Sequence, residues 1–210
     1  MTIANACLLG VCVLLADAPA LKLRASGIGA AAAASPMTIE LVRWSTDVER
    51  ASLMKALSAP PPPPPTPVGP GPAGTSAAGR GLRGRGPAPP PPSPLMRLTA
   101  AIKSAPTVGF IWGDGPTGFS IKYAWRAAAS DGRERIVLVT DRRIGANSTS
   151  WPAAKGAAAD ADFTVLEMRI DGKGGEAKLS LTAPVVVDTA ANTLALDASV
   201  DAPALLKVTR

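Results

Sequence analysis

The second half of this chain carries a two-residue hydrophobic period, and that period restricts what the chain can fold into. Between residues 119 and 126, large apolar side chains alternate with small or polar ones. A strand that buries one face has this pattern, because successive side chains point to opposite sides of a sheet. We therefore expect one core-facing set and one solvent-facing set: Phe119, Ile121, Tyr123 and Trp125 toward the core, and Lys122 and Arg126 toward solvent.

Further strands are predicted down to the C-terminus. Residues 135–140 are apolar on both faces, which is typical of a central strand. Two hairpins and a last strand follow: 166–170 with 179–181 around Asp171–Gly175, 185–187 with 194–196 around Ala190–Asn192, and 205–208. Closely spaced turns without intervening helices indicate an antiparallel sheet, folded as a sandwich or closed as a barrel.

A strand and a helix are predicted upstream. Residues 38–44 alternate as a strand, and Thr46 and Glu49 then have the spacing of a capping box. The helix that follows places Leu53, Met54 and Leu57 on one face and ends at the prolines.

A second helix begins near residue 94. Ser93 is a suitable N-cap, and Pro94 suits the first helical position because its fixed φ is helical. Its apolar face is Leu95, Leu98 and Ile102, and Pro106 stops it. The predicted fold class is therefore α+β, mainly antiparallel β with two short helices packed on the sheet.

Residues 59–94 interrupt the domain with a low-complexity segment. It contains two runs of prolines and three arginines among glycines: Pro60–Pro65, Arg80, Arg83, Arg85 and Pro89–Pro92. Such a composition cannot bury enough apolar surface to offset the entropy of ordering it, so we expect disorder with polyproline II pieces. The domain is predicted to consist of residues 35–58 and 95–210, with 59–94 as an insertion.

The N-terminus has features of a secretory signal. Residues 6–16 form an apolar run that is too short to span a bilayer. Ala18-Pro19-Ala20 follows as a small-x-small cleavage pattern, and the Ala-rich tract that ends at Ala34 offers a second. We expect residues 1–34 to be signal peptide and leader, and the protein to be periplasmic or secreted. The alternative is a buried N-terminal helix of a cytoplasmic protein. No run of 18 apolar residues occurs, so no membrane span is expected.

Missing residue types exclude several chemistries. The chain has no histidine, and its two cysteines, Cys7 and Cys12, fall in the predicted leader. A mature protein without these residues has no imidazole base, no Ser/His/Asp triad, no thiolate nucleophile and no disulfide. Zinc sites built from histidine or cysteine are excluded for the same reason.

The net charge of +6 does not predict a nucleic-acid partner. From Pro106 to Arg210 there are 12 Lys plus Arg and 12 Asp plus Glu, so the predicted domain is neutral. Part of the excess is Arg80, Arg83 and Arg85, which resemble an RNA-binding arginine–glycine box but have no interleaved aromatic residue for base stacking. We expect no nucleic-acid partner.

Several sequence segments resemble a family of small exported bacterial proteins for which no activity is known. They are Arg43–Asp47 with Glu49-Arg50, Val108–Ile111, Gly118–Ala124, Arg135–Arg142 and Phe163–Met168. The resemblance covers residues 38–58 and 94–210, and it implies that the family joins the two helices by a short loop where this chain inserts 59–94. It implies no functional residue.

Two groups of acidic residues could carry chemistry. Asp188-Thr189-Ala190 resembles the loop of aspartic proteases, but Ala190 replaces the glycine, and Asp197-Ala198-Ser199 is a poor second motif. Asp160, Asp162 and the segment 171–176 offer oxygen ligands for calcium, but Lys173 stands where a ligand is needed. We expect turns at both places, and assign no catalytic, cofactor-binding or metal-binding residue.

The four tryptophans are Trp44, Trp112, Trp125 and Trp151. They could line a ligand pocket or a carbohydrate platform, but scarce aromatic residues in a small domain usually anchor the core, and we expect that role here. Trp151 is the exception, because it lies in a long polar loop, and such loops are functional or disordered.

These observations favour a non-catalytic binding domain of the cell envelope, with a partner protein or a small apolar ligand. A second hypothesis is a hydrolase that uses carboxylates or a Ser–Lys pair, since neither needs histidine or cysteine. A structural envelope protein is the third. Converging carboxylates in a polar cleft would favour the enzyme, and a deep apolar cavity would favour the binding domain.

Overall fold

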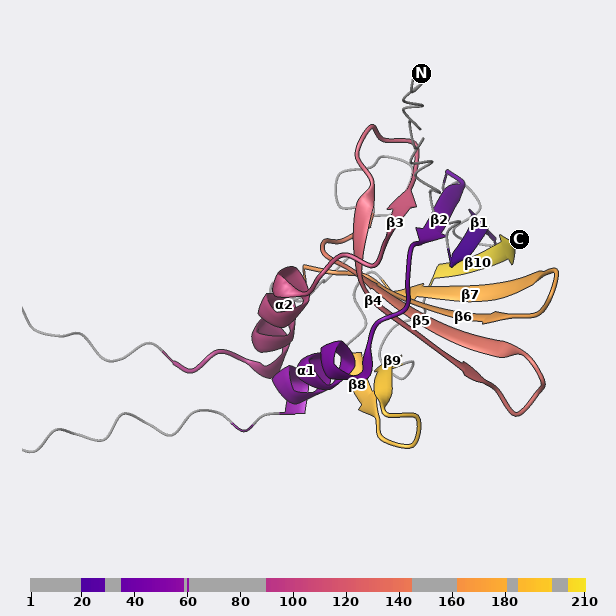
Figure 1. The fold of residues 1–210 in the computed structure, drawn as a ribbon. Helices are drawn as coiled ribbons and strands as arrows, with labels where there is room; N and C mark the ends of the chain where they lie inside the picture. Colours follow the sequence, from indigo (N-terminus) through magenta and orange to yellow (C-terminus); the bar gives the residue numbers. More distant parts are fainter. Residues whose placement is uncertain are drawn as a thin grey trace, which may run out of the picture.

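Eight strands close into an antiparallel barrel, and two helices with a separate hairpin pack on its outer face (Figure 1). The computed structural model describes residues 20–28, 35–58, 60, 90–144, 162–180, 185–197 and 204–210. Around the barrel the strands are β1 (Leu21–Gly27), β10 (Ala204–Thr209), β7 (Gly174–Ser180), β6 (Val165–Ile170), β5 (Glu134–Thr140), β4 (Phe119–Ala128), β3 (Gly109–Trp112) and β2 (Met37–Leu41). The other elements are α1 (Asp47–Ser58), α2 (Pro94–Ser104), and the hairpin of β8 (Val185–Asp188) and β9 (Thr193–Leu196).

The predicted fold class is confirmed, and of the two predicted sheet forms the barrel is the one observed. Every neighbouring pair of strands around the barrel is antiparallel, and β1 closes the ring by pairing with both β2 and β10. In the part of the chain that the structure describes, no helix is long and apolar enough to cross a membrane.

Side chains fill the barrel interior. All eight strands contribute to one buried cluster, in which Ile39, Ile111, Ile136, Met168 and Leu206 each have an exposed fraction of 0%. A side chain with no exposed area touches no space that admits a water molecule, so these residues leave no room for a ligand among them. An eight-stranded barrel is about the size that side chains alone can fill.

Aromatic side chains cover both ends of this core. Phe119 at the start of β4 packs against it, with the Arg142 guanidinium 5.0 Å from its ring. Trp44 also packs against the core, with the Arg126 guanidinium 4.6 Å from its ring. Because Arg126 lies near the end of β4, the two rings mark opposite ends of the barrel.

A β-bulge in β4 changes the face of the strand. The pairing with β5 shifts between Ile121 and Tyr123, so that Ile121 lies opposite Thr140 and Tyr123 opposite Val139. Ile121 belongs to the barrel interior, whereas Tyr123 and Trp125 belong to a second cluster outside it. The prediction that all four residues of the alternating set face one core is therefore wrong after Ile121, because the bulge inserts one residue and reverses the alternation.

The second cluster lies between the outer face of the barrel and the elements that cover it. It combines Tyr123 and Trp125 of β4 and Val137 and Val139 of β5 with apolar residues of both helices and of the β8–β9 hairpin: Leu53, Met54, Leu98, Ile102, Val185 and Leu194. The barrel wall in this region is buried on both sides. This explains why residues 135–140 are apolar on both faces.

The helices form as predicted. The Ser93 side chain accepts from the Met96 amide at 3.1 Å, and Pro94 opens α2. Leu98 and Ile102 are buried in α2, as Leu53 and Met54 are in α1. The Arg97 guanidinium donates to the Ala56 carbonyl oxygen at 3.2 Å, so the end of α1 lies beside the start of α2.

Both predicted hairpins are present. Leu166 lies opposite Leu179 in the β6–β7 pair, and Val187 lies opposite Leu194 in the β8–β9 pair. The turn of the second hairpin includes Asn192, whose positive φ of 47° suits asparagine better than most residues. The last strand, predicted at 205–208, is β10.

The N-terminal boundary of the domain differs from the prediction. Residues 21–27, which we placed in the leader, form β1, and Leu21, Leu23 and Ala25 point into the barrel. The residues of this strand alternate with a period of two, but the strand lies next to an Ala-rich tract in the sequence. Composition alone therefore placed the start of the domain too late. The segments 1–19 and 61–89, and with them the proline-rich core and Arg80, Arg83 and Arg85, lie outside the described residues.

Candidate functional site

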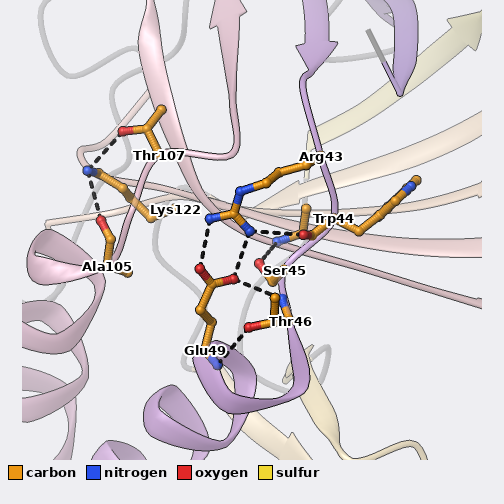
Figure 2. A network of polar contacts seen from close by, with 9 residues as sticks. Arg43, Trp44, Ser45, Thr46, Glu49, Ala105, Thr107 and Lys122 are labelled. Atoms are coloured by element: carbon orange, nitrogen blue, oxygen red, sulfur yellow. Dashed lines mark hydrogen bonds and ion pairs between the residues drawn. The ribbon is translucent and has the colours of Figure 1, made fainter. Parts of the chain in front are cut away.

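The link between β2 and α1 carries a dense set of polar contacts (Figure 2). The Arg43 guanidinium donates two hydrogen bonds to the Glu49 carboxylate, at 2.7 and 2.9 Å. The same carboxylate accepts from the Thr46 amide at 2.8 Å, while Thr46 Oγ1 accepts from the Glu49 amide at 3.3 Å. The predicted capping box is thus confirmed, and its glutamate is shared with an arginine that follows β2.

Ser45 fastens this link to the barrel, and Lys122 fastens the segment after α2 to the same strand. The Ser45 amide donates to the Ala124 carbonyl oxygen, and Ser45 Oγ accepts from the Ala124 amide, both at 3.0 Å. Lys122, at the bulge of β4, donates to the Ala105 carbonyl oxygen at 3.0 Å and to Thr107 Oγ1 at 3.1 Å (Figure 2). Lys122 is half-buried rather than directed into solvent as we expected, because its ammonium group reaches the segment after α2.

The polar side chains of this junction have structural roles. Hydrogen bonds from Arg43 hold the pKa of Glu49 at about 2, below its ordinary value of 4.5, so the carboxylate stays ionised at neutral pH. A general acid or base works best with a pKa near the working pH. A Ser–Lys catalytic pair needs the lysine beside the serine hydroxyl, whereas the Lys122 ammonium binds Ala105 and Thr107. The junction offers no proton-transfer machinery.

A second polar cluster joins the β8–β9 hairpin to the barrel. Arg135 of β5 donates to Glu167 at 2.9 Å and to Asp188 at 2.7 Å, and its side chain is only 17% exposed. The hydrogen bond from Arg135 lowers the pKa of Asp188, and the bond from the Ala191 amide acts in the same direction. Asp188 therefore opens the hairpin turn, as we expected, and shares no proton with a second carboxylate.

Tyr123 completes the attachment of the hairpin. Its hydroxyl lies 2.5 Å from Thr193 Oγ1, and both residues are buried. Burial raises the pKa of the Tyr123 phenol, so the group is neutral at physiological pH. Arg50 of α1 donates to the Asn192 carbonyl oxygen at 3.2 Å and lies 6.0 Å from the Trp125 ring. These contacts fix the hairpin between α1 and the barrel.

The outer face of β3 carries two exposed aromatic rings. The side chains of Phe110 and Trp112 are 37% and 41% exposed, and their ring centroids lie 5.7 Å apart with the planes tilted by 34°. Ile111 between them points into the barrel with no exposed area. We call Phe110 and Trp112 the aromatic platform.

Trp112 in the platform rests on the backbone of the β3–β4 connection. A Cβ atom on Gly118 would lie 2.9 Å from Cε3 and Cζ3 of the Trp112 ring, so only glycine allows the backbone to come this close. The Arg142 guanidinium donates to the Gly118 carbonyl oxygen at 2.5 Å and holds the glycine in place. The ring is thereby supported from one side.

Polar side chains border the platform on the neighbouring strands. Thr38 lies opposite Trp112, while Glu40 and Ser120 lie opposite Phe110, one on each side. Glu40 forms an ion pair with Lys22 at 2.6 Å, so the charge of this carboxylate is balanced within the protein. The result is an apolar centre of two rings with hydroxyl and carboxylate groups at its edge.

A groove over β6, β7 and β10 is a weaker candidate site. It has a volume of about 410 Å³ and includes the side chains of Ile28 and Leu205. Its arginines have acidic partners, since Asp131 lies 2.8 Å from Arg133 and 3.6 Å from Arg169. The charges of the groove are therefore largely neutralised from within the protein.

The acidic residues that suggested calcium serve other roles. The Asp171 carboxylate accepts from the amides of Lys173 and Gly174 at 2.8 and 3.0 Å, which is turn chemistry as expected. Asp162 pairs with Lys103 at 2.7 Å. Among the residues whose placement is described, no group of three or more potential metal ligands occurs. Asp160 and Ala198-Ser199 lie outside the described residues.

The burial of the tryptophans differs in part from our prediction. Trp125 is buried, with 8% exposed, and Trp44 is half-buried against the barrel core, so both are anchors as predicted. Trp112 is not an anchor but an exposed ring. Trp151 lies outside the described residues. The signal that identifies Trp112 is the run Gly109–Trp112, in which the aromatic residues share one strand face and Gly109 and Ile111 the other.

No known protein family matches this chain, and neither a curated protein nor a solved structure matches it. The resemblance to small exported bacterial proteins stays a prediction. Most residues of its first segment, Arg43–Arg50, belong to the junction in Figure 2 and have structural roles there.

Proposed function

We propose that this chain is an exported, non-catalytic binding domain whose binding surface is the aromatic platform of Phe110 and Trp112. The observation that carries the proposal is the exposure of two adjacent rings on the outer face of β3, where neighbouring strands present polar side chains. Tryptophan is enriched among the residues that dominate the energetics of binding sites, and aromatic rings contribute large contact areas there.

Two further observations support binding rather than catalysis. The carboxylates of the two polar clusters described above are bound within the protein: Glu49 by Arg43 and Thr46, and Asp188 by Arg135. The barrel interior is filled by its own side chains, which argues against a small apolar ligand held inside it. We therefore propose that the ligand or partner binds on the outer surface of the barrel.

Export is part of the proposal and rests on the N-terminal sequence. Cleavage after Ala20 would leave Leu21 as the first residue and keep all of β1. Cleavage near Ala34 would remove β1, although β1 pairs with both β2 and β10. The first position is therefore the one that we propose.

Oxidative footprinting tests the proposed surface and does not require the ligand to be identified first. The protein would be modified in the envelope fraction of its host and, separately, after purification from that fraction. We expect Phe110 and Trp112 to be protected in the envelope fraction relative to the purified protein. Met96 is 48% exposed on α2 and serves as the internal control that should react equally in both samples. Equal modification of Trp112 in both samples would contradict the proposal.

A further inference from the structure

We infer that the ligand of the aromatic platform is a carbohydrate chain, an inference that rests on the proposed function. The first argument is the shape of the site. A pyranose ring presents a flat face of C–H groups, which packs against the face of an aromatic ring, where the electron density is negative. Phe110 and Trp112 place two partly exposed aromatic rings next to each other, tilted by 34° with centroids 5.7 Å apart.

The second argument is that the tryptophan is held before any ligand arrives. Gly118 supports the ring from one side, and Arg142 holds Gly118 through its carbonyl oxygen. A ring that is already fixed loses little entropy on binding, which favours stacking with a weakly apolar partner such as a sugar.

The third argument is the border of the platform. The edge of a sugar ring carries hydroxyl groups, which must find donors and acceptors when water is displaced. Thr38 lies beside Trp112, and Glu40 and Ser120 lie beside Phe110, so hydroxyl and carboxylate groups stand where those sugar hydroxyls would be. Lys22 balances the charge of Glu40 in the border, and a carboxylate beside Phe110 suits a neutral polymer better than a polyanion.

A protein partner fits this surface less well. A stable protein interface buries about 800 Å² on each partner, and the platform provides two apolar side chains. Of the other large exposed apolar residues in the described ranges, Val42 directly follows β2 beside β3. The rest belong to other elements: Ile28, Val48, Met96, Val186 and Leu205. Strand addition is not available at β3, because β2 and β4 pair with both of its edges.

Retention of the purified protein beginning at Leu21 on insoluble polysaccharides tests the inference. The probes are cellulose, chitin and peptidoglycan sacculi, each incubated with the protein and washed. We expect at least one probe to retain the wild type. Trp112→Ala and Phe110→Ala should each weaken that retention about tenfold or more, because stacking and apolar burial on one ring together contribute on the order of 1.4 kcal/mol. Trp112→Phe should keep part of it.

Matched variants separate recognition from folding. Val48→Ala removes an exposed apolar side chain on α1, 81% exposed, and should bind as the wild type does. Gly118→Ala touches no ligand but displaces the Trp112 ring, and should weaken retention while the thermal transition moves little. Glu40→Gln should weaken retention less than the ring truncations.

The possible outcomes distinguish the carbohydrate inference from the proposed binding function. If no probe retains the wild type but footprinting shows Trp112 protected in the envelope, the carbohydrate inference is overturned and the binding domain stands. If a probe retains the wild type and Trp112→Ala equally well, the platform is not the carbohydrate site. If protease treatment of the envelope fraction removes the footprint and glycosidase treatment does not, the ligand is a protein and the inference fails.

Discussion

Ser45 and Ala124 exchange two hydrogen bonds, one through the Ser45 amide and one through its side-chain oxygen, both at 3.0 Å. Ser45 thus acts as a one-residue extension of the sheet next to the bulge in β4. Ala124 has an exposed fraction of 0%, so its amide is shielded from solvent in the folded protein.

Ser45→Ala should therefore lower the free energy of unfolding by about 1–3 kcal/mol, the cost of leaving a buried amide without a partner. Urea denaturation measures it. Ser104→Ala is the control, because the Ser104 hydroxyl donates to the Ala101 carbonyl oxygen at the exposed end of α2, and it should change stability by under about 0.5 kcal/mol. Equal effects of the two substitutions would mean that the Ser45–Ala124 exchange does not hold α1 to the barrel.

The Arg43–Glu49 pair predicts a specific acid dependence. The hydrogen bonds from Arg43 lower the pKa of Glu49 from 4.5 to about 2 in the folded protein. Between these values the unfolded chain binds a proton that the folded protein does not, so stability falls as the pH falls through this window. Glu49→Gln should be less stable than the wild type at pH 7, by about 1 kcal/mol or less, since the pair is partly exposed.

The difference between wild type and Glu49→Gln should shrink between about pH 4.5 and pH 2 and vanish below, as denaturation at several pH values would show. Asp162→Asn provides the control, because Asp162 and Lys103 form a pair with both side chains 52% exposed. That variant should differ from the wild type by under about 0.5 kcal/mol throughout. A difference for Glu49→Gln that is independent of pH would contradict the assignment.

The sequence predicted those elements whose signals are local. The capping box of Thr46 and Glu49, the Ser93-Pro94 helix start and the turn at Asp171 each depend on residues a few positions apart. The pairing of Leu166 with Leu179 follows from the same local pattern. These features do not depend on the rest of the chain.

What the sequence could not predict depends on contacts between distant segments. Lys122 has apolar neighbours on both sides in the sequence. A regular strand and a bulged strand therefore show the same local pattern there. Only the burial of both faces of β4 distinguishes the bulged strand from the regular one. β1 is stabilised by β10 at the other end of the chain. The exposure of Trp112 was missed because the helices and the hairpin cover β4 and β5, and nothing local shows that they leave β3 uncovered.

Trp125 and Trp112 should differ strongly in their contribution to stability. Trp125→Ala removes a ring that is 8% exposed in the cluster between barrel and helices, and should cost about 3–5 kcal/mol. Trp112→Ala removes a ring that is 41% exposed and should cost under about 1 kcal/mol. Denaturation of the two variants side by side measures the difference. If Trp112→Ala proved the more damaging, the platform would be a packing element and its proposed role in binding would fall.

The inserted segment should be dispensable for folding. Replacing residues 61–89 with a short Gly/Ser linker should change the free energy of unfolding by under about 1 kcal/mol, because only loop-closure entropy changes. The linker needs little length, since Arg97 at the start of α2 already contacts Ala56 near the end of α1. Ser93 must be kept, because it caps α2. A loss of several kcal/mol in thermal or urea unfolding would show that the replaced residues pack against the domain.

The last prediction concerns where the mature protein begins. Leu21, Leu23 and Ala25 point into the barrel with 8%, 1% and 1% of their areas exposed, and β1 connects β2 to β10. A protein that begins after Ala34 would lack these side chains and would expose the edges of two strands, which promotes aggregation. N-terminal sequencing of protein secreted by its host should therefore give Leu21 as the first residue. A version truncated to begin at Ser35 should express poorly or aggregate, whereas one that begins at Leu21 should melt cooperatively. If the natural mature protein began near residue 35 and were stable, the closing role of β1 would be wrong.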